Sequence, residues 1–338
     1  MSGRKGTDDS MTLQSQKFQI GGFRVEEVLQ QADYLYESGE TERLYQLLIQ
    51  HKDSEDAELL WRLARASRDL AQLSGTSAEE KKALVYEALE YAKRALEKNE
   101  ASFAAHKWCA ICISDVGDYE GIKAKIANAY VIKEHFEKAI ELNPKDATSI
   151  HLMGIWCYTF AEMPWYQRRI ANMLFAAPPS STYEEALGYF QKAEQALLRR
   201  WKRLLPPPPR DLGARGPMCS VLRALSAMLR LLLALGYFQK AEQVREPLLL
   251  TACSLLLSTA AEVEEAPATA TAATLASLDP NFYSKNLLLL GKTYLKLQNK
   301  KLAAFWLLKA KDYPTRTEED KQIQREAAQL LAEFSGKN

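Results

Sequence analysis

The sequence predicts an all-α protein built from pairs of antiparallel helices. Apolar residues recur at helical spacing, as Ile132, Phe136 and Ala139 do at i, i+4 and i+7. Pro144 then ends that helix, because proline has no N–H to donate and constrains the residue before it. A second helix follows within a few residues. Its Gly154 is small enough to let a neighbouring helix approach closely.

A helix, a proline stop and a helix with a small residue in mid-face are typical of the joint between two tetratricopeptide-type repeats. We therefore expect a tetratricopeptide-like helical-repeat solenoid, whose last helix caps the open end of the stack. The expected helices are, in order, one from Val25 to a break at Ser38–Thr41, one around Leu44–Leu48, Asp56–Leu70, one after Ser77, Phe103–Ile113, Ile122–Leu142, Ala147–Phe160, one from Tyr183, Leu287–Tyr294, Ala303–Ala310 and the capping helix Glu318–Phe334.

Two stretches between these helices are expected to be loops. The first is D-V-G-D-Y-E-G at Asp115–Gly121. The second, Met163–Phe175, contains Pro164 and precedes Pro178-Pro179. Aromatic residues are dense around this second stretch: Trp156, Phe160, Trp165, Tyr166 and Phe175. They indicate either an atypical loop packed on the solenoid or an apolar groove for a partner helix or an acyl chain.

Composition argues against several classes of protein. The net charge of +1 leaves no strong overall field to recruit nucleic acid or a membrane, so only local patches would do so. The five cysteines are odd in number and lie mostly in apolar helical runs, which fits a reducing, cytoplasmic location. The N-terminus has no apolar core of a secretory signal, and Arg223 and Arg230 interrupt the longest apolar stretch. We expect no transmembrane segment.

An exact internal duplication interrupts the repeat pattern. A-L-G-Y-F-Q-K-A-E-Q occurs at Ala186–Gln195 and again at Ala234–Gln243. Joining the end of either copy to Asp279-Pro280 restores the repeat spacing. The chain therefore divides into a disordered segment (1–22), helical repeats (23–195), a low-complexity insertion (196–278), and a last repeat with its capping helix (279–338).

The insertion has two interpretations. Its proline run, its leucine-dense stretch and its Ala/Thr tract favour a retained non-coding sequence or a duplicated exon without a function of its own. The alternative is a lineage-specific insertion with a binding role. Only one decapeptide can fill the single helix position. We favour the first copy, because Ser180–Thr182 offer N-cap residues before it.

No arrangement of residues predicts catalysis, a metal or a cofactor. Cys109-x2-Cys112 lacks the second pair that a zinc site needs, so both thiols are expected in the core. The four histidines share no ligand spacing, and we expect surface or hairpin contacts for them. No phosphate loop, G-x-S-x-G or H-E-x-x-H motif is present. The sequence favours a protein that is not an enzyme.

Basic residues offer the candidate binding surface. Most lysines are expected on solvated faces, but the first helices of such repeats line the solenoid's groove. A two-carboxylate clamp needs lysine and asparagine on several first helices, and only Lys285-Asn286 fits that pattern, so we do not expect that class of partner. The candidates for contact with an acidic partner are Lys107, Lys285 and Lys292 on first helices, and Lys123 and Lys125 on the long helix.

Four longer strings carry a specific resemblance. They are W-C-A-I-C-I-S-D-V-G-D-Y-E-G-I-K-A-K-I (Trp108–Ile126), H-F-E-K-A-I-E-L-N-P-K-D (His135–Asp146), G-I-W-C-Y (Gly154–Tyr158) and D-P-N-F-Y-S-K-N-L-L-L-L-G-K-T-Y (Asp279–Tyr294). With them the chain resembles the regulator of microtubule dynamics protein family, most closely its short first member. The insertion departs from the family pattern.

The resemblance implies a helical-repeat adaptor associated with microtubules, the spindle and the spindle poles. Acidic tubulin tails would then be the partner of the basic residues. A membrane-anchored relative works at mitochondrial contacts and binds lipid through its repeats. The resemblance therefore leaves a second interpretation, a phospholipid-binding or lipid-transfer module associated with mitochondria.

Overall fold

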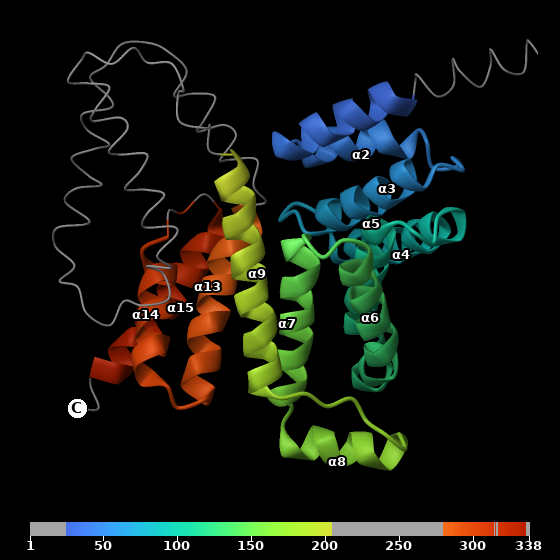
Figure 1. Ribbon diagram of the computed structural model, residues 1–338. Helices are drawn as coiled ribbons and strands as arrows, with labels where there is room; N and C mark the ends of the chain where they lie inside the picture. The colour runs from blue at the N-terminus through green and yellow to red at the C-terminus, as the bar shows by residue number, and fades with distance from the viewer. Residues whose placement is uncertain (1–24, 205–279, 314, 316, 336–338) are drawn as a thin grey trace, which may run out of the picture. The chain divides into compact units, whose positions relative to one another are not determined.

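The computed structural model describes residues 25–204 and 280–335, apart from positions 314 and 316. Every regular element in these residues is an α-helix, which confirms the predicted fold class (Figure 1). None of the helices described is both long and apolar enough to span a bilayer.

The chain divides into two compact units. The first joins residues 1–197 to residues 279–338, and the second comprises residues 198–278. Of the second unit the structure describes only the end of one helix. The predicted segment 1–22, the second decapeptide and most of the predicted insertion lie outside the described residues.

The helices of the first unit follow the predicted order. The first is described over residues 25–37. The others are α2 (Thr41–Ile49), α3 (Ala57–Ala71), α4 (Ala78–Lys98), α5 (Phe103–Glu120), α6 (Ile122–Leu142), α7 (Ala147–Ala161), α8 (Trp165–Leu174), α9 (Tyr183–Leu204), α13 (Pro280–Lys296), α14 (Lys300–Lys311) and α15 (Glu318–Ser335).

Small residues and polar caps form the N-terminal hairpins as the sequence predicts. Ala88, Ala92 and Ala95 of α4 are fully or almost fully buried, so α4 packs closely on its neighbours. The Ser77 hydroxyl accepts a hydrogen bond from the Glu80 N–H at 3.3 Å and caps α4.

The predicted loop at Asp115–Gly121 is wrong, because α5 continues through Glu120. Val116 is buried on the core face of α5, and the Asp115 carboxylate lies 2.6 Å from the Arg68 guanidinium of α3. These tertiary contacts outweigh the local turn propensity of the glycines. The helix ends only at Gly121, whose φ of +86° suits glycine.

The first decapeptide copy forms the helix that pairs with α7. Phe190 in α9 is fully buried, and a Cβ on Gly154 would lie 2.6 Å from its ring. Gly154 therefore permits the close approach that the sequence indicates. Thr182 and Glu185 exchange backbone-to-side-chain hydrogen bonds of 3.1 and 3.2 Å, a capping box that starts α9.

The predicted loop Met163–Phe175 is also wrong, because Trp165–Leu174 forms helix α8. Pro164 occupies the N-cap position, where its missing N–H costs no helical hydrogen bond. In Figure 1, α8 crosses beyond the ends of α7 and α9 instead of running beside them. It is thus an extra helix within the connection of one hairpin.

The C-terminal hairpin and its capping helix are confirmed. A Cβ on Gly291 of α13 would lie 2.6 Å from the Leu307 side chain of α14. Helix α15 packs on both. The Ser284 hydroxyl donates a buried 2.6 Å hydrogen bond to Asp320, which ties α13 to the first turn of α15.

Candidate functional site

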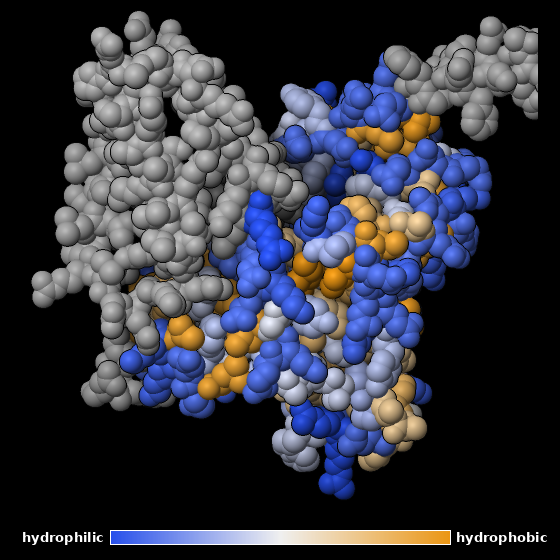
Figure 2. All heavy atoms as spheres, viewed as in Figure 1, coloured by the Kyte–Doolittle hydropathy of each residue, from blue (hydrophilic) through white to orange (hydrophobic). Residues whose placement is uncertain are grey.

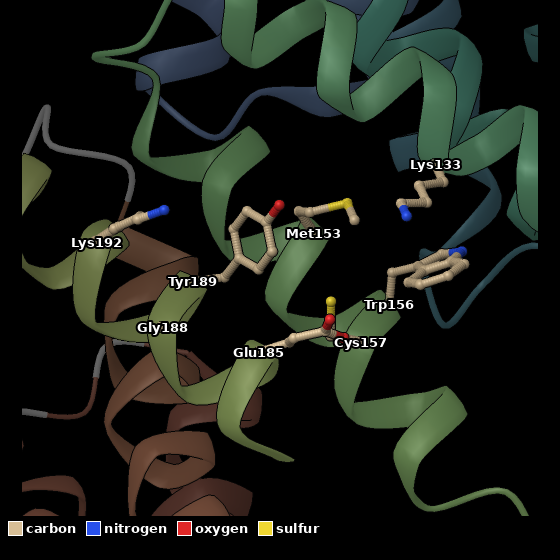
Figure 3. A pocket seen from close by; sticks show the side chains of 8 residues that line it. All are labelled: Lys133, Met153, Trp156, Cys157, Glu185, Gly188, Tyr189 and Lys192. Carbon is tan, nitrogen blue, oxygen red and sulfur yellow. The ribbon is translucent and has the colours of Figure 1, made fainter. Parts of the chain in front are cut away.

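A groove of about 260 Å³ opens between α6, α7 and α9 (Figure 3). Its floor comes from Met153, Trp156 and Cys157, which lie at i, i+3 and i+4 and so share one face of α7. All three are buried. The Trp156 indole N–H donates to the Ala129 carbonyl oxygen at 3.0 Å, so the ring is held in one orientation.

Two lysines flank this floor. In Figure 3, Lys133 of α6 and Lys192 of α9 reach the groove from opposite sides. The Lys133 ammonium lies 5.3 Å from the centre of the Trp156 ring, and the Lys192 ammonium lies 5.3 Å from the centre of the Tyr189 ring. A cation over an aromatic face is favourable and leaves its outer hydrogen-bond donors in solvent.

One acidic side chain, Glu185, also lines the groove. It accepts hydrogen bonds from the Thr182 N–H and the Ser181 hydroxyl, so its charge stabilises the N-terminus of α9. Lys133 also lies 3.7 Å from Glu137 in a half-exposed pair, a contact that contributes little in water. The two lysines remain available to a negatively charged ligand.

Gly188 opens the wall of the groove on α9. A Cβ added there would meet no atom within 4 Å, so the missing side chain leaves room for a ligand. The arrangement suits a short segment that carries acidic groups for the two lysines and an apolar or aromatic side chain for the floor. Burial raises the pKa of the Cys157 thiol, which keeps it protonated and disfavours a role as nucleophile.

The five lysines proposed from the sequence lie elsewhere. Lys107 is mostly buried and lies 3.3 Å from Asp146, the N-cap residue of α7. Lys285 and Lys292 of α13 each lie 2.9 Å from a glutamate of α15. Thus three lysines of first helices pair with acids on a neighbouring helix or at its N-cap, and their role in partner binding stays a prediction.

The remaining two lie near the start of α6. Lys125 pairs with Asp118 at 2.5 Å. Lys123 is exposed and has no ion-pair partner among the described residues. Neither lines the groove, although both share a helix with Lys133.

The predicted cysteine positions are confirmed. Cys109 and Cys112 are buried, and burial raises the pKa of the Cys109 thiol to about 11. Next to them the Nδ1 atoms of His106 and His135 are 2.9 Å apart. Within the described part of the chain, no group of three His, Cys, Asp or Glu residues is arranged to hold a metal ion.

Sequence reasoning missed Lys192, although a signal was present. Residues 186, 190, 193 and 197 of α9 form its buried stripe. Residues 185, 188, 189 and 192 repeat at i, i+3, i+4 and i+7 beside it, and they form the α9 wall of the groove. This second stripe, residues 185, 188, 189 and 192, lies at the boundary between the core and solvent, and its spacing is visible in the sequence.

A family model described as "Regulator of microtubule dynamics protein 1-3" matches residues 28–205 and 251–335. The internal residues left unmatched, 206–250, fall within the predicted insertion and make up only part of it. The match covers α6, α7 and α9, which form the groove, as well as α8 and the C-terminal hairpin.

Two curated relatives share 64% identity with this chain. They are regulator of microtubule dynamics protein 1 of Pongo abelii, over 315 residues (93% of this chain and 74% of that protein), and of Bos taurus, over 316 residues (94% and 74%). Regulator of microtubule dynamics protein 3 of Xenopus laevis is 41% identical over 172 residues, 49% of this chain and 37% of that protein. The greater similarity to the first member confirms the resemblance found in the sequence.

Among solved structures, a thermophilic TPR protein of Thermus thermophilus is similar to this chain. The match covers 91% of this chain and 98% of that protein's chain, at 13% identity and a TM-score of 0.46. This similarity is too weak to bear on function.

Proposed function

The chain belongs to the regulator of microtubule dynamics protein family, and on this premise we propose that it is a non-enzymatic adaptor that associates with microtubules. It would act in the cytoplasm on the cytoskeleton, including the spindle and its poles. The groove between α6, α7 and α9 would receive an acidic segment of tubulin.

The observation that carries this proposal is the pair of lysines on either side of an aromatic floor. Lys133 and Lys192 each lie over a ring, so they are oriented before a ligand arrives. An acidic segment would place carboxylates on both ammonium groups and an apolar side chain on Met153 and Trp156. Preorganisation of this kind lowers the entropy cost of binding.

The lysines of the N-terminal half of α6 would supply a second, weaker contribution. Lys123 and Lys125 are exposed and lie on the same helix as Lys133. They would attract an acidic partner over a distance of about a Debye length, roughly 8 Å in physiological salt. Lys107, Lys285 and Lys292 would contribute only if a partner displaced their acidic neighbours.

The test is cosedimentation of the full chain with microtubules at increasing salt. Affinity should fall steeply as salt rises, because the contacts are between charges. The double variant Lys133→Gln/Lys192→Gln should bind about tenfold more weakly and show a shallower dependence on salt. Lys138→Gln serves as the matched control, since Lys138 is an exposed lysine of α6 that pairs with Glu141 outside the groove.

Three results would contradict the proposal: no cosedimentation, cosedimentation that salt does not weaken, or an unchanged affinity in the double variant. Loss of binding in the Lys123→Gln/Lys125→Gln variant alone would move the site to the start of α6. The relatives' names give no support to the alternative of a lipid-transfer module.

A further inference from the structure

Helix α8 turns its apolar face away from the protein. At 3.6 residues per turn, Trp165, Arg169, Met173, Tyr166 and Ile170 fall within an arc of about 140°. The side chains of Trp165 and Met173 are both 76% exposed, whereas Ala171, outside this arc, is fully buried. A surface helix normally faces the core with its apolar stripe, so the orientation of α8 is reversed.

This exposure belongs to a helix that is fixed in place. Ala171 anchors its inner side. The Tyr130 hydroxyl of α6 donates a 2.8 Å hydrogen bond to the Ala177 carbonyl oxygen, and Pro179 is buried, so the segment after α8 is fastened to the repeats. The stripe is therefore presented to solvent in a defined orientation.

The charge of this segment has one sign. Residues 163–180 include Arg168 and Arg169 and no aspartate or glutamate. The preceding Glu162 accepts hydrogen bonds from Lys296 at 2.6 Å and from the Tyr183 hydroxyl at 3.0 Å, so a neighbouring lysine neutralises its charge. Figure 2 shows strongly hydrophilic atoms beside pale and tan atoms in the region of α8.

We propose that α8 is an interfacial helix that docks this chain on an anionic membrane surface. The chemistry of the stripe fits the boundary between headgroups and acyl chains: tryptophan and tyrosine prefer this level, isoleucine and methionine add apolar area, and the arginines meet anionic headgroups. A bilayer accepts a convex stripe without shape complementarity. A protein partner would need a matching groove together with acidic groups at two positions.

This docking is separate from the groove. None of the α8 residues lines the groove between α6, α7 and α9. Membrane binding through α8 and binding of an acidic segment in the groove therefore depend on different residues, and either can fail without the other.

The test is flotation of the full chain with vesicles of phosphatidylcholine alone and with about 30 mol% phosphatidylserine. We expect binding to the anionic vesicles and about tenfold less to the neutral ones, because the arginines need anionic partners. Trp165→Ala/Met173→Ala should lower binding about tenfold or more by removing inserted apolar area. Tyr34→Ala is the control, since Tyr34 is another largely exposed aromatic (66%) and lies on the first helix.

Two further measurements keep the outcome unambiguous. Circular dichroism should show unchanged helicity in the α8 variant, because both replaced side chains are largely in solvent. Brominated lipids should quench a fluorescence component that Trp165→Phe removes. Binding to neither vesicle type, or equal binding by the α8 variant, would overturn the proposal. So would loss of microtubule cosedimentation in that variant without loss of flotation, because the stripe would then dock on protein.

Discussion

In α7 and again in α13, a glycine lies where the second helix of the pair comes closest. A Cβ on Gly154 would lie 2.6 Å from the Phe190 ring, and one on Gly291 would lie 2.6 Å from the Leu307 side chain. The two hairpins thus pack in the same way: a side chain of the second helix contacts a glycine of the first. That side chain is an aromatic ring in the first hairpin and an aliphatic one in the second.

Their connections differ. Three residues, 297–299, join α13 to α14, with Gln298 at a positive φ of 60°. Between α7 and α9 the connection spans residues 162–182 and contains α8. The close contact forms in both, so the packing of a hairpin does not depend on a short turn. A connection that is not needed for hairpin packing can carry another function, and α8 lies in such a connection.

One buried amide joins the two hairpins. Asn286 of α13 lies 2.9 Å from the His151 Nδ1 of α7 and donates to the Phe190 carbonyl oxygen of α9 at 3.2 Å. All three groups are buried. These polar groups satisfy one another's hydrogen bonds, so burying them costs little free energy. We call this contact of Asn286, His151 and the Phe190 carbonyl the seam, and it specifies how the two hairpins meet.

The largest expected effect comes from truncating the side chains that face the glycines. Phe190→Ala should lower the free energy of unfolding by about 3–5 kcal/mol and Leu307→Ala by about 2–5 kcal/mol, since each leaves a cavity in a buried contact. Urea denaturation measures both. Tyr34→Ala should stay within about 0.5 kcal/mol. A loss below about 1 kcal/mol at Phe190 would mean that the aromatic contact is not part of the core.

Overpacking the glycines should have the next largest effect. Gly154→Val and Gly291→Val should each lower the free energy of unfolding by about 1–3 kcal/mol, because the new atoms overlap the facing side chain. The comparison predicts which partner relieves each overlap. Leu307→Ala should be less costly in the presence of Gly291→Val than alone, whereas its effect in Gly154→Val should be additive. Equal coupling in both backgrounds would contradict the pairing.

Acid should weaken the seam. Burial lowers the pKa of His151 to about 3, against about 6.5 in an unfolded chain. Between these values only the unfolded chain binds the proton, so stability is retained above pH 6.5 and falls as pH decreases. The loss from this group should reach about 2 kcal/mol at about pH 5.

Denaturation midpoints measured from about pH 7 to about pH 5 test this expectation. His151→Gln keeps a hydrogen-bonding group for Asn286 and removes the titration, so its stability should vary less with pH than that of the parent chain. His135 also has a pKa lowered by burial, and its contribution should remain in both proteins. An identical pH dependence in the variant would exclude His151 as a source of the acid sensitivity.

The smallest expected effect is a gain. Gly188 lies inside α9 with open space around its Cβ position, so Gly188→Ala should raise the free energy of unfolding by about 0.5–1 kcal/mol. The same replacement at Gly39, where φ is +74°, should lower it by about 1 kcal/mol. Thermal denaturation would show shifts of opposite sign. A shift in the same direction at both sites would exclude the backbone as the cause.

The helix pairs were predictable because their apolar stripes face the core. The spacing of small and apolar residues indicates which helix face packs on a neighbour. This holds for Gly154, for the alanines of α4 and for the first decapeptide. Helix α8 was not predictable in this way. Its apolar residues face solvent, and the prolines around it indicate a loop.

For the candidate site, the sequence predicted the type of residue but not the particular residues. Lysine is the residue type expected to meet an acidic partner, but periodicity does not reveal which lysines have an acid nearby. The partners of Lys107 and Lys292, Asp146 and Glu326, lie more than thirty positions away in sequence. Lys192 lies beside the apolar stripe of Ala186, Phe190 and Ala193, but that stripe alone does not show that a groove opens next to Lys192.

The contacts between α9 and α13 have a consequence for the continuity of the chain. Gln191 donates to the Tyr294 hydroxyl at 2.8 Å, the Tyr283 hydroxyl donates to Glu194 at 3.1 Å, and Asn286 adds its bond to Phe190. These bonds join the two helices across the intervening residues 205–279. Two separately expressed fragments, one ending after α9 and the other beginning at α13, should therefore associate without a covalent link and reconstitute the stack.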